Sequence, residues 1–159
     1  MWDQEKKHIA TFDKIVLQHG VRPTFLYPLW KVAAFSLGAG TAMMGRRTAM
    51  ACTEAVETMI GEHYDSFVYL LSYPSTYHRL MEGSNMNRQL KSISDPVEFP
   101  SNHPSIVLLR KILTEFRDDE LEHLDTAIAN DSQKAPIHAL LSAVIAGGCK
   151  VAIAATERV

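Results

Sequence analysis

The sequence predicts an all-α fold, a bundle of about five helices, and three observations support this prediction. Apolar residues recur at helical spacing along most of the chain. Glycine and proline interrupt the pattern at intervals that suit helices. No segment shows the alternation or the Asn-Gly turn typical of paired strands. With 159 residues, of which 47% are hydrophobic and 21% charged, residues 1–159 are expected to form a single domain with a sizeable core.

The first helix is expected over residues 2–18, where apolar side chains repeat at threes, fours and sevens. His19-Gly20 should end it, because glycine readily adopts the left-handed conformation that follows a helix. A turn at 22–24 precedes a second helix, which Pro28 can open in its first turn. Gly45 should stop this helix after Met44.

The segment from Phe25 to Met44 is apolar enough to resemble a membrane span, with Lys31 as its single charge. Pro28, Gly38 and Gly40 interrupt it. We therefore expect first a core helix packed on all sides, second a helix lying in a membrane interface, and third a true span.

A third helix is expected over residues 48–72, where Pro74 terminates it. Residues 73–103 are rich in proline, serine and asparagine and predict a loop insertion, with a short helical piece at 76–81. Pro104 should begin a fourth helix that runs to Ala129, and residues 130–132 should turn the chain. Pro136 should begin the last helix, which runs to about residue 158.

Composition excludes some classes of function. The net charge of −2 gives no electrostatic basis for binding nucleic acid. Cys52 and Cys149 lie far apart in apolar surroundings, and no Cys-x-x-Cys motif is present. They are expected to be buried thiols that act as small hydrophobic residues. We identify no targeting segment in these residues.

The sequence repeats one short motif on two predicted helices. EKKH (Glu5 to His8) and ELEH (Glu120 to His123) both place a carboxylate three residues before an imidazole. Positions i and i+3 share one face of a helix, so each pair can converge on one point. Helix bundles that bind two irons use this motif twice, together with single glutamates from other helices. A solvated helix face is the competing explanation of each motif.

A metal site of this type needs a further inward carboxylate, and the third predicted helix offers candidates. Glu54 and Glu57 lie one turn apart, and Tyr64 follows Glu57 by two turns on the same face. Glu57 stands among apolar neighbours, where a carboxylate must be paired, metal-bound or protonated. Each histidine would also donate its other ring N–H to an outer carboxylate. The residues near the motifs leave four candidates for that role: Asp13, Asp118, Asp119 and Glu122.

Several ordered stretches resemble one family. MWDQEKKH, RPTFLYPLW, LGAGTA, AMACTEAVE, EHY, FRDDELEHLD and GGCKVAIAATERV are similar to segments of the demethoxyubiquinone hydroxylases, members of the ferritin-like di-iron superfamily. The resemblance covers nearly the whole chain outside residues 73–103. It implies a ferritin-like helix bundle and an O₂-dependent monooxygenase with two iron ions, which hydroxylates the ring of a demethoxy-polyprenyl benzoquinol in ubiquinone biosynthesis.

The resemblance also implies roles for particular residues. Glu5 with His8, and Glu120 with His123, correspond to the two Glu-x-x-His ligand pairs, and Glu57 to the bridging glutamate. His63 and Tyr64 correspond to a pair expected between the metal site and the quinone pocket, as catalytic relay residues. Glu54 matches no ligand and is expected on an exposed face.

The front of the chain departs from the family pattern. The helix that carries the family's first glutamate ligand has no counterpart before Met1, so we expect a fragment or a short form with five protein ligands and an uncovered apolar stripe. The resemblance implies a peripheral position on the matrix side of the mitochondrial inner membrane, with other ubiquinone-biosynthesis proteins or a second copy of the chain as partners. Two alternatives stay open: an iron-buffering ferritin-like protein, and a non-catalytic bundle that binds quinone or a partner.

Overall fold

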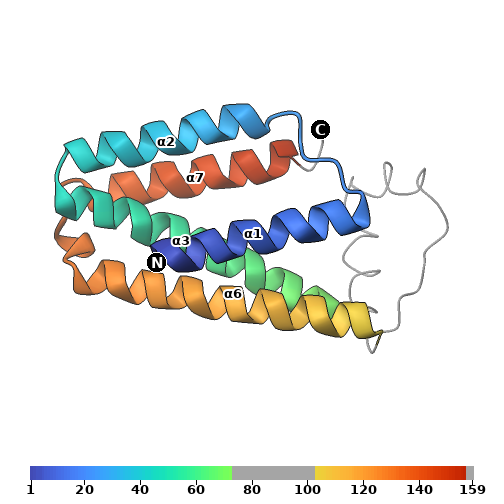
Figure 1. Ribbon diagram of the computed structural model, residues 1–159. Helices are drawn as coiled ribbons and strands as arrows, with labels where there is room; N and C mark the ends of the chain where they lie inside the picture. Colours follow the sequence, from blue (N-terminus) through green and yellow to red (C-terminus); the bar gives the residue numbers. More distant parts are fainter. Residues whose placement is uncertain (73–102, 157–159) are drawn as a thin grey trace, which may run out of the picture. The chain divides into compact units, whose positions relative to one another are not determined.

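The computed structural model describes residues 1–72 and 103–156, and this part of the chain is helical (Figure 1). Five α-helices and one short 3₁₀-helix are present, and the described residues contain no strand. The all-α prediction is confirmed. The predicted loop and its helical piece at 76–81 lie outside the described residues. The helices are α1 (Trp2–His19), α2 (Tyr27–Met43), α3 (Arg46–Ser72), α6 (Pro104–Ala129), η1 (Ser132–Lys134) and α7 (His138–Thr156).

The described residues group into two compact units. One contains Met1–Gly61 with Asp118–Val159, and the other lies within Glu62–Arg117. The boundary passes through α3 and α6, so each of these helices contributes to both units. The organisation of the chain as a single domain stays a prediction.

Local signals in the sequence set most helix ends. Gly20 adopts a left-handed conformation (φ 62°) after α1, and its N–H and that of Val21 donate to the last carbonyls of the helix. Pro28 lies in the first turn of α2, and Gly45 follows that helix with φ 111°. Glycine tolerates these positive φ angles because it has no Cβ. These ends therefore agree with the prediction, and α6 has the predicted bounds.

The start of α7 corrects one prediction. Pro136 does not open the helix, which begins two residues later at His138. Ile137 stands between them with φ 56°, a conformation that a right-handed helix cannot include. The preceding turn also contains a left-handed residue, Asp131 with φ 64°. The expected end of this helix near residue 158 lies outside the described residues.

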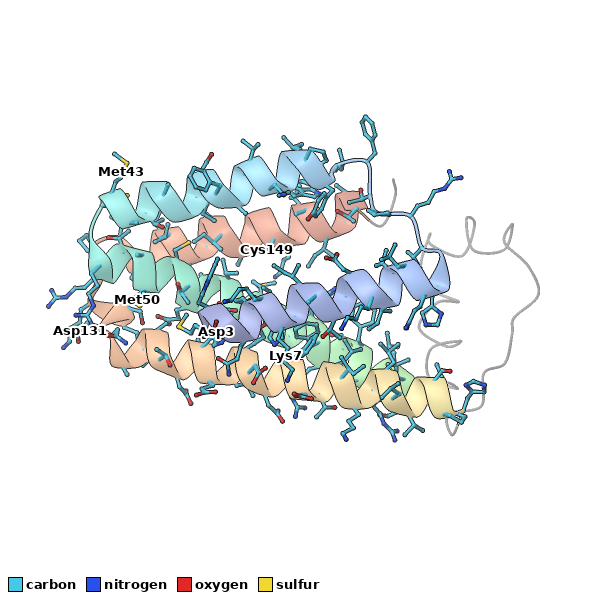
Figure 2. The ribbon with its side chains drawn as sticks, viewed as in Figure 1. Asp3, Lys7, Met43, Met50, Asp131 and Cys149 are labelled. Atoms are coloured by element: carbon cyan, nitrogen blue, oxygen red, sulfur yellow. The ribbon has the colours of Figure 1, made fainter. Side chains whose placement is uncertain are left out.

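The expectation that α2 is a core helix packed on all sides is wrong. Thr41 is its one buried residue, and the segment 31–40 is exposed throughout. Met43 points away from the helices in Figure 2 and is 89% exposed. The reason is that the described residues cover α2 on one side alone. There it lies beside α7 (Figure 1), and Trp30 Nε1 donates to Thr156 Oγ1 over 3.1 Å.

The other apolar helix, α7, is also largely exposed. Ile145 is its one buried residue. Among the described helices, α7 is the one whose length and hydropathy would suffice to cross a bilayer. Together, α2 and α7 carry nine of the exposed large apolar side chains of the first unit: Tyr27, Leu29, Val32, Phe35, Leu37, Met43, Leu140, Val144 and Val151.

A small apolar cluster joins α3 to α7. Cys52, Ala55 and Ile145 are buried in it, and Cys149 (Figure 2) packs against them. Burial raises the pKa of the Cys52 thiol, although its hydrogen bond with Thr41 opposes the rise. Burial and the neighbouring Cys52 raise the pKa of Cys149. Both thiols are therefore less acidic than a free cysteine. Cys52 is buried, as predicted, whereas Cys149 is half-buried.

Candidate metal centre

Three helices of the first unit bring four acidic or imidazole side chains together. Glu5 comes from α1, Glu57 from α3, and Glu120 and His123 from α6. One potential ligand atom from each lies within 4.8 Å of the others. Glu120 and His123 meet because positions i and i+3 share a helix face. Four of the five residues that the sequence singled out as ligands thus form one cluster.

The fifth residue, His8, faces the same carboxylates. Its side chain is buried, and its Nδ1 lies 3.3 Å from Glu120 Oε1 and 4.0 Å from Glu5 Oε2. Because His8 follows Glu5 by one turn of α1, both side chains of this Glu-x-x-His motif point toward α6. The two motifs therefore oppose each other across the α1–α6 contact.

The buried Glu120 and the half-buried Glu57 bring two carboxyl groups together in this cluster. Glu120 is 2% exposed, and burial, a hydrogen bond with Glu57 and the charges of Glu57 and Glu5 raise its pKa to about 8. Burial also raises the pKa of Glu57, which the hydrogen bond with Glu120 partly offsets, while the charge of Glu5 adds to the rise. Two carboxylates this close cannot both ionise without a compensating charge. At neutral pH the metal-free pair therefore holds one proton.

His123 lies among several hydrogen-bond acceptors. It is fully buried, and its Nδ1 lies 3.2 Å from Glu5 Oε1 and 3.3 Å from Glu120 Oε2. A single ring nitrogen carries at most one proton, so it cannot satisfy both carboxylates. Glu5 Oε1 is buried and has no hydrogen-bond partner among the described residues. Unpaired buried oxygens around a buried imidazole are what a cation site requires.

An outer layer of hydrogen bonds holds both imidazoles. His8 Nε2 lies 2.9 Å from Asp119 Oδ2, and His123 Nε2 lies 3.0 Å from Gln4 Oε1. Gln4 Nε2 donates to Asp119 Oδ1 over 3.1 Å, which connects the two pairs. Burial opposes ionisation of Asp119, but the hydrogen bonds from His8 and Gln4 outweigh it and lower its pKa.

The sequence left four acidic residues as candidates for the outer partners of the histidines. In the structure, Asp119 is the outer partner of His8. The partner of His123 was missed, because the search considered carboxylates and Gln4 is an amide. One signal could have indicated it. Gln4 directly precedes Glu5, just as Asp119 directly precedes Glu120.

The two residues expected to act as a catalytic relay lie in the second unit. The His63 ring packs edge-on against Phe67, with ring centroids 4.7 Å apart. The Tyr64 ring meets Phe116 at a centroid distance of 6.4 Å. Their role toward the metal cluster stays a prediction.

Glu54 corrects the expectation of an exposed face. Its side chain is 15% exposed and accepts a hydrogen bond from His138 Nε2 over 3.1 Å. This contact joins α3 to the first residue of α7. Glu54 is therefore a structural partner of His138, one turn away from the cluster.

Comparison with known proteins identifies the family of this chain. The family model described as ubiquinone biosynthesis protein COQ7 matches residues 1–156. The chain belongs to this family. Three relatives are similar over almost all of the chain: the NADPH-dependent 3-demethoxyubiquinone 3-hydroxylase, mitochondrial, of Mus musculus (41% identical), the 5-demethoxyubiquinone hydroxylase, mitochondrial, of Saccharomyces cerevisiae (40%) and the 3-demethoxyubiquinol 3-hydroxylase of Rhodospirillum rubrum (40%).

The alignments cover 99–100% of the chain and 60–61% of these three relatives, so the chain spans about three fifths of their length. The helical structure agrees with the ferritin-like bundle that the resemblance implied.

Proposed function

We propose that this chain forms a di-iron centre and that the protein hydroxylates the ring of a demethoxy-polyprenyl benzoquinol in ubiquinone biosynthesis. The observation that carries the proposal is the convergence of three glutamates and two histidines from α1, α3 and α6. Membership of the family and the names of the relatives support the reaction.

The donors present fit a pair of iron ions. Carboxylate oxygens and neutral imidazole nitrogens are ligands that suit iron, and carboxylates can bridge two cations. The unpaired Glu5 Oε1 and the shared proton of Glu57 and Glu120 indicate a charge deficit that cations would fill. We propose Glu5, His8, Glu57, Glu120 and His123 as the ligands, with Glu57 as the bridging residue.

The residues around the ions would prepare the site for oxygen chemistry. Bound iron supplies the redox chemistry for activating dioxygen. One oxygen atom enters the quinol ring and the other leaves as water, which consumes two electrons from a reductant and two protons. Binding of the cations displaces the proton of Glu120, because a ligand carboxylate must be ionised. We propose that His63 and Tyr64 relay protons or electrons toward the substrate.

The first test is the iron content of the chain, purified without oxygen and supplied with ferrous iron. We expect two irons per chain, and clearly fewer in the Glu57→Gln variant. Glu54→Gln is the matched control, because this glutamate lies one turn away on α3 and pairs with His138 instead of the cluster. Equal iron in the two variants would contradict the assignment of Glu57. An iron content near zero in the unsubstituted chain would contradict the centre itself.

We also propose that the exposed apolar side of α2 and α7 rests on a membrane surface, where a substrate with an isoprenoid tail resides. Phe35 on α2 is 78% exposed and Val144 on α7 is 63% exposed. Exposed apolar faces of this extent mark membrane or protein contacts, and tyrosine and tryptophan prefer the interface. The mouse and yeast relatives are named as mitochondrial proteins. We place the protein on the matrix side of the inner membrane, peripherally, with other ubiquinone-biosynthesis proteins or a second copy as further partners.

Flotation with phospholipid vesicles tests this surface. We expect the unsubstituted chain to float with the vesicles and the double variant Phe35→Glu, Val144→Glu to stay in the aqueous fraction. Leu17→Glu is the control, because Leu17 is an equally exposed apolar residue on α1. If the double variant floats as well as the control, α2 and α7 do not form the membrane contact.

The same apolar surface argues against the iron-buffering alternative, which needs no route for a lipid. A non-catalytic bundle that binds quinone would keep the surface and the substrate but form no product. Hydroxylated quinol, measured by mass spectrometry with reductant and oxygen supplied, separates the hydroxylase from both alternatives.

A further inference from the structure

We propose that Asp119 and Gln4 form one positioning unit that fixes the ring tautomers of both ligand histidines. In this arrangement His8 and His123 both carry their proton on Nε2 and present an unprotonated Nδ1 to the metal centre. The inference rests on the proposed metal centre and assigns residues outside it.

The first step concerns the orientation of the Gln4 amide. Gln4 Nε2 lies 3.1 Å from Asp119 Oδ1 and 3.1 Å from Glu122 Oε2. Ionised carboxylates only accept hydrogen bonds, so the group that faces them must be the donor, the amide nitrogen. The two acidic side chains thus determine which end of the amide points toward α6.

The second step transmits this orientation to His123. With the nitrogen held by the carboxylates, the amide oxygen faces His123 Nε2 at 3.0 Å. An amide oxygen only accepts, so the proton of the ring must sit on Nε2. Nδ1 then carries a lone pair, and it faces Glu5 and Glu120. The missing hydrogen-bond partner of Glu5 Oε1 agrees with an Nδ1 that has no proton to donate.

The third step is direct and concerns His8. Its Nε2 lies 2.9 Å from Asp119 Oδ2, and a carboxylate can only accept this bond. The His8 proton therefore sits on Nε2, and Nδ1 faces Glu120 with a lone pair. Asp119 uses one oxygen for His8 and the other for Gln4. One ionised side chain thereby sets both imidazoles, one directly and one through an amide.

The path alternates between the two helices: His8 on α1, Asp119 on α6, Gln4 on α1 and His123 on α6. Both positioning residues directly precede the glutamate of a Glu-x-x-His motif, in QEKKH and DELEH. Each motif therefore orients the histidine of the other. The outer partners also differ, because an ionised carboxylate makes an imidazole a stronger donor to a metal than a neutral amide does.

Nitrogen NMR of chains labelled with ¹⁵N-histidine tests the unit, because protonated and unprotonated ring nitrogens resonate at separate frequencies. Spectra are recorded for the metal-free chain at a pH where both rings are neutral, and again with zinc as a diamagnetic probe. We expect both rings of the unsubstituted chain to carry the proton on Nε2. Asp119→Asn should shift the tautomer populations of both rings, whereas Gln4→Leu should shift that of His123 alone. Gln4→Glu should restore the His123 tautomer, because it returns an acceptor to Nε2.

Zinc affinity, measured by competition with a chromophoric chelator, gives a second readout. Loss of an outer hydrogen bond to a ligand histidine weakens metal binding by roughly 10- to 100-fold. We expect this loss for Asp119→Asn. Asp125→Asn is the matched control, since it makes the same change at an exposed position of the same helix, and it should leave affinity and tautomers unchanged.

The outcomes separate this inference from the metal centre on which it rests. If the unsubstituted chain carries a proton on Nδ1 of either ring, or if Asp119→Asn leaves the His123 ring unchanged, the positioning unit is overturned. If zinc binds tightly and equally to all variants, the centre stands and the unit fails. If the chain binds no zinc, the proposed centre fails, and the metal-free spectra still decide the unit. Should Asp119→Asn not fold, Gln4→Leu and Gln4→Glu decide the His123 half.

Discussion

The carboxyl pair of Glu57 and Glu120 makes the stability of the metal-free chain depend on pH in an unusual direction. Glu120 has an ordinary pKa near 4.5 in the unfolded chain and a pKa of about 8 in the folded one. Between these values the folded state binds a proton that the unfolded state has lost, so the free energy of unfolding falls as pH rises. At 1.36 kcal/mol per pH unit, the full interval corresponds to roughly 5 kcal/mol.

The perturbation is Glu120→Gln, which keeps the shape of the side chain and removes the titrating group. Urea unfolding of the metal-free chain between about pH 5 and about pH 9 should show that the unsubstituted chain loses several kcal/mol of stability as the pH rises. The variant should lose much less over the same range, because its buried amide never has to ionise. Asp125→Asn, an exposed change on the same helix, should behave like the unsubstituted chain.

The same slope in Glu120→Gln and in the unsubstituted chain would refute the reasoning, because the pH dependence would then arise elsewhere. A free energy of unfolding that rises with pH in the unsubstituted chain would refute it too. Added zinc should reverse the dependence, since a cation favours the ionised carboxylates.

Three further predictions follow from particular side chains. Glu57→Gln should lower the pKa of Glu120 toward its ordinary value, measured by ¹³C NMR of the carboxyl, because the hydrogen bond and charge of Glu57 both raise it; an unchanged pKa would show that Glu57 does not contribute to the rise. Phe116→Ala should cost about 3–5 kcal/mol of stability in thermal or urea unfolding, because Phe116 is 1% exposed, and a loss below about 1 kcal/mol would contradict its place in the core. Ile137→Asn should stabilise the chain by up to about 1 kcal/mol, because Ile137 is exposed with φ 56° and asparagine tolerates that conformation better; destabilisation in the same unfolding assay would count against the strain.

The helix pattern was predictable because its signals are local. Gly20, Gly45 and Pro104 act within one turn of their own position, through a missing Cβ or a fixed φ. The start of α7 was not predictable in this way. Pro136 is a valid opening residue, and the positive φ of Ile137 follows from how the turn after α6 is held, which the sequence does not show.

The candidate site was partly readable for the same reason. Each Glu-x-x-His motif places its two side chains on one face of its own helix, whatever the rest of the chain does. The roles of Gln4 and Glu54 depend on contacts between residues more than 80 positions apart: Gln4 with His123 and Glu54 with His138. No periodicity carries that information.

The sequence by itself determined the helical class, most helix ends and the two Glu-x-x-His pairs of the candidate cluster, because backbone preferences and one-turn spacing act locally. The tertiary structure decided which histidine meets which outer partner and which apolar helix stays exposed. The α2 segment is as apolar as a core helix. Its residues 31–40 are nevertheless exposed, because the described elements, α7 among them, cover only one side of it. Burial and hydrogen-bond pairing are properties of the packed chain, since they depend on what other elements bring to the same place.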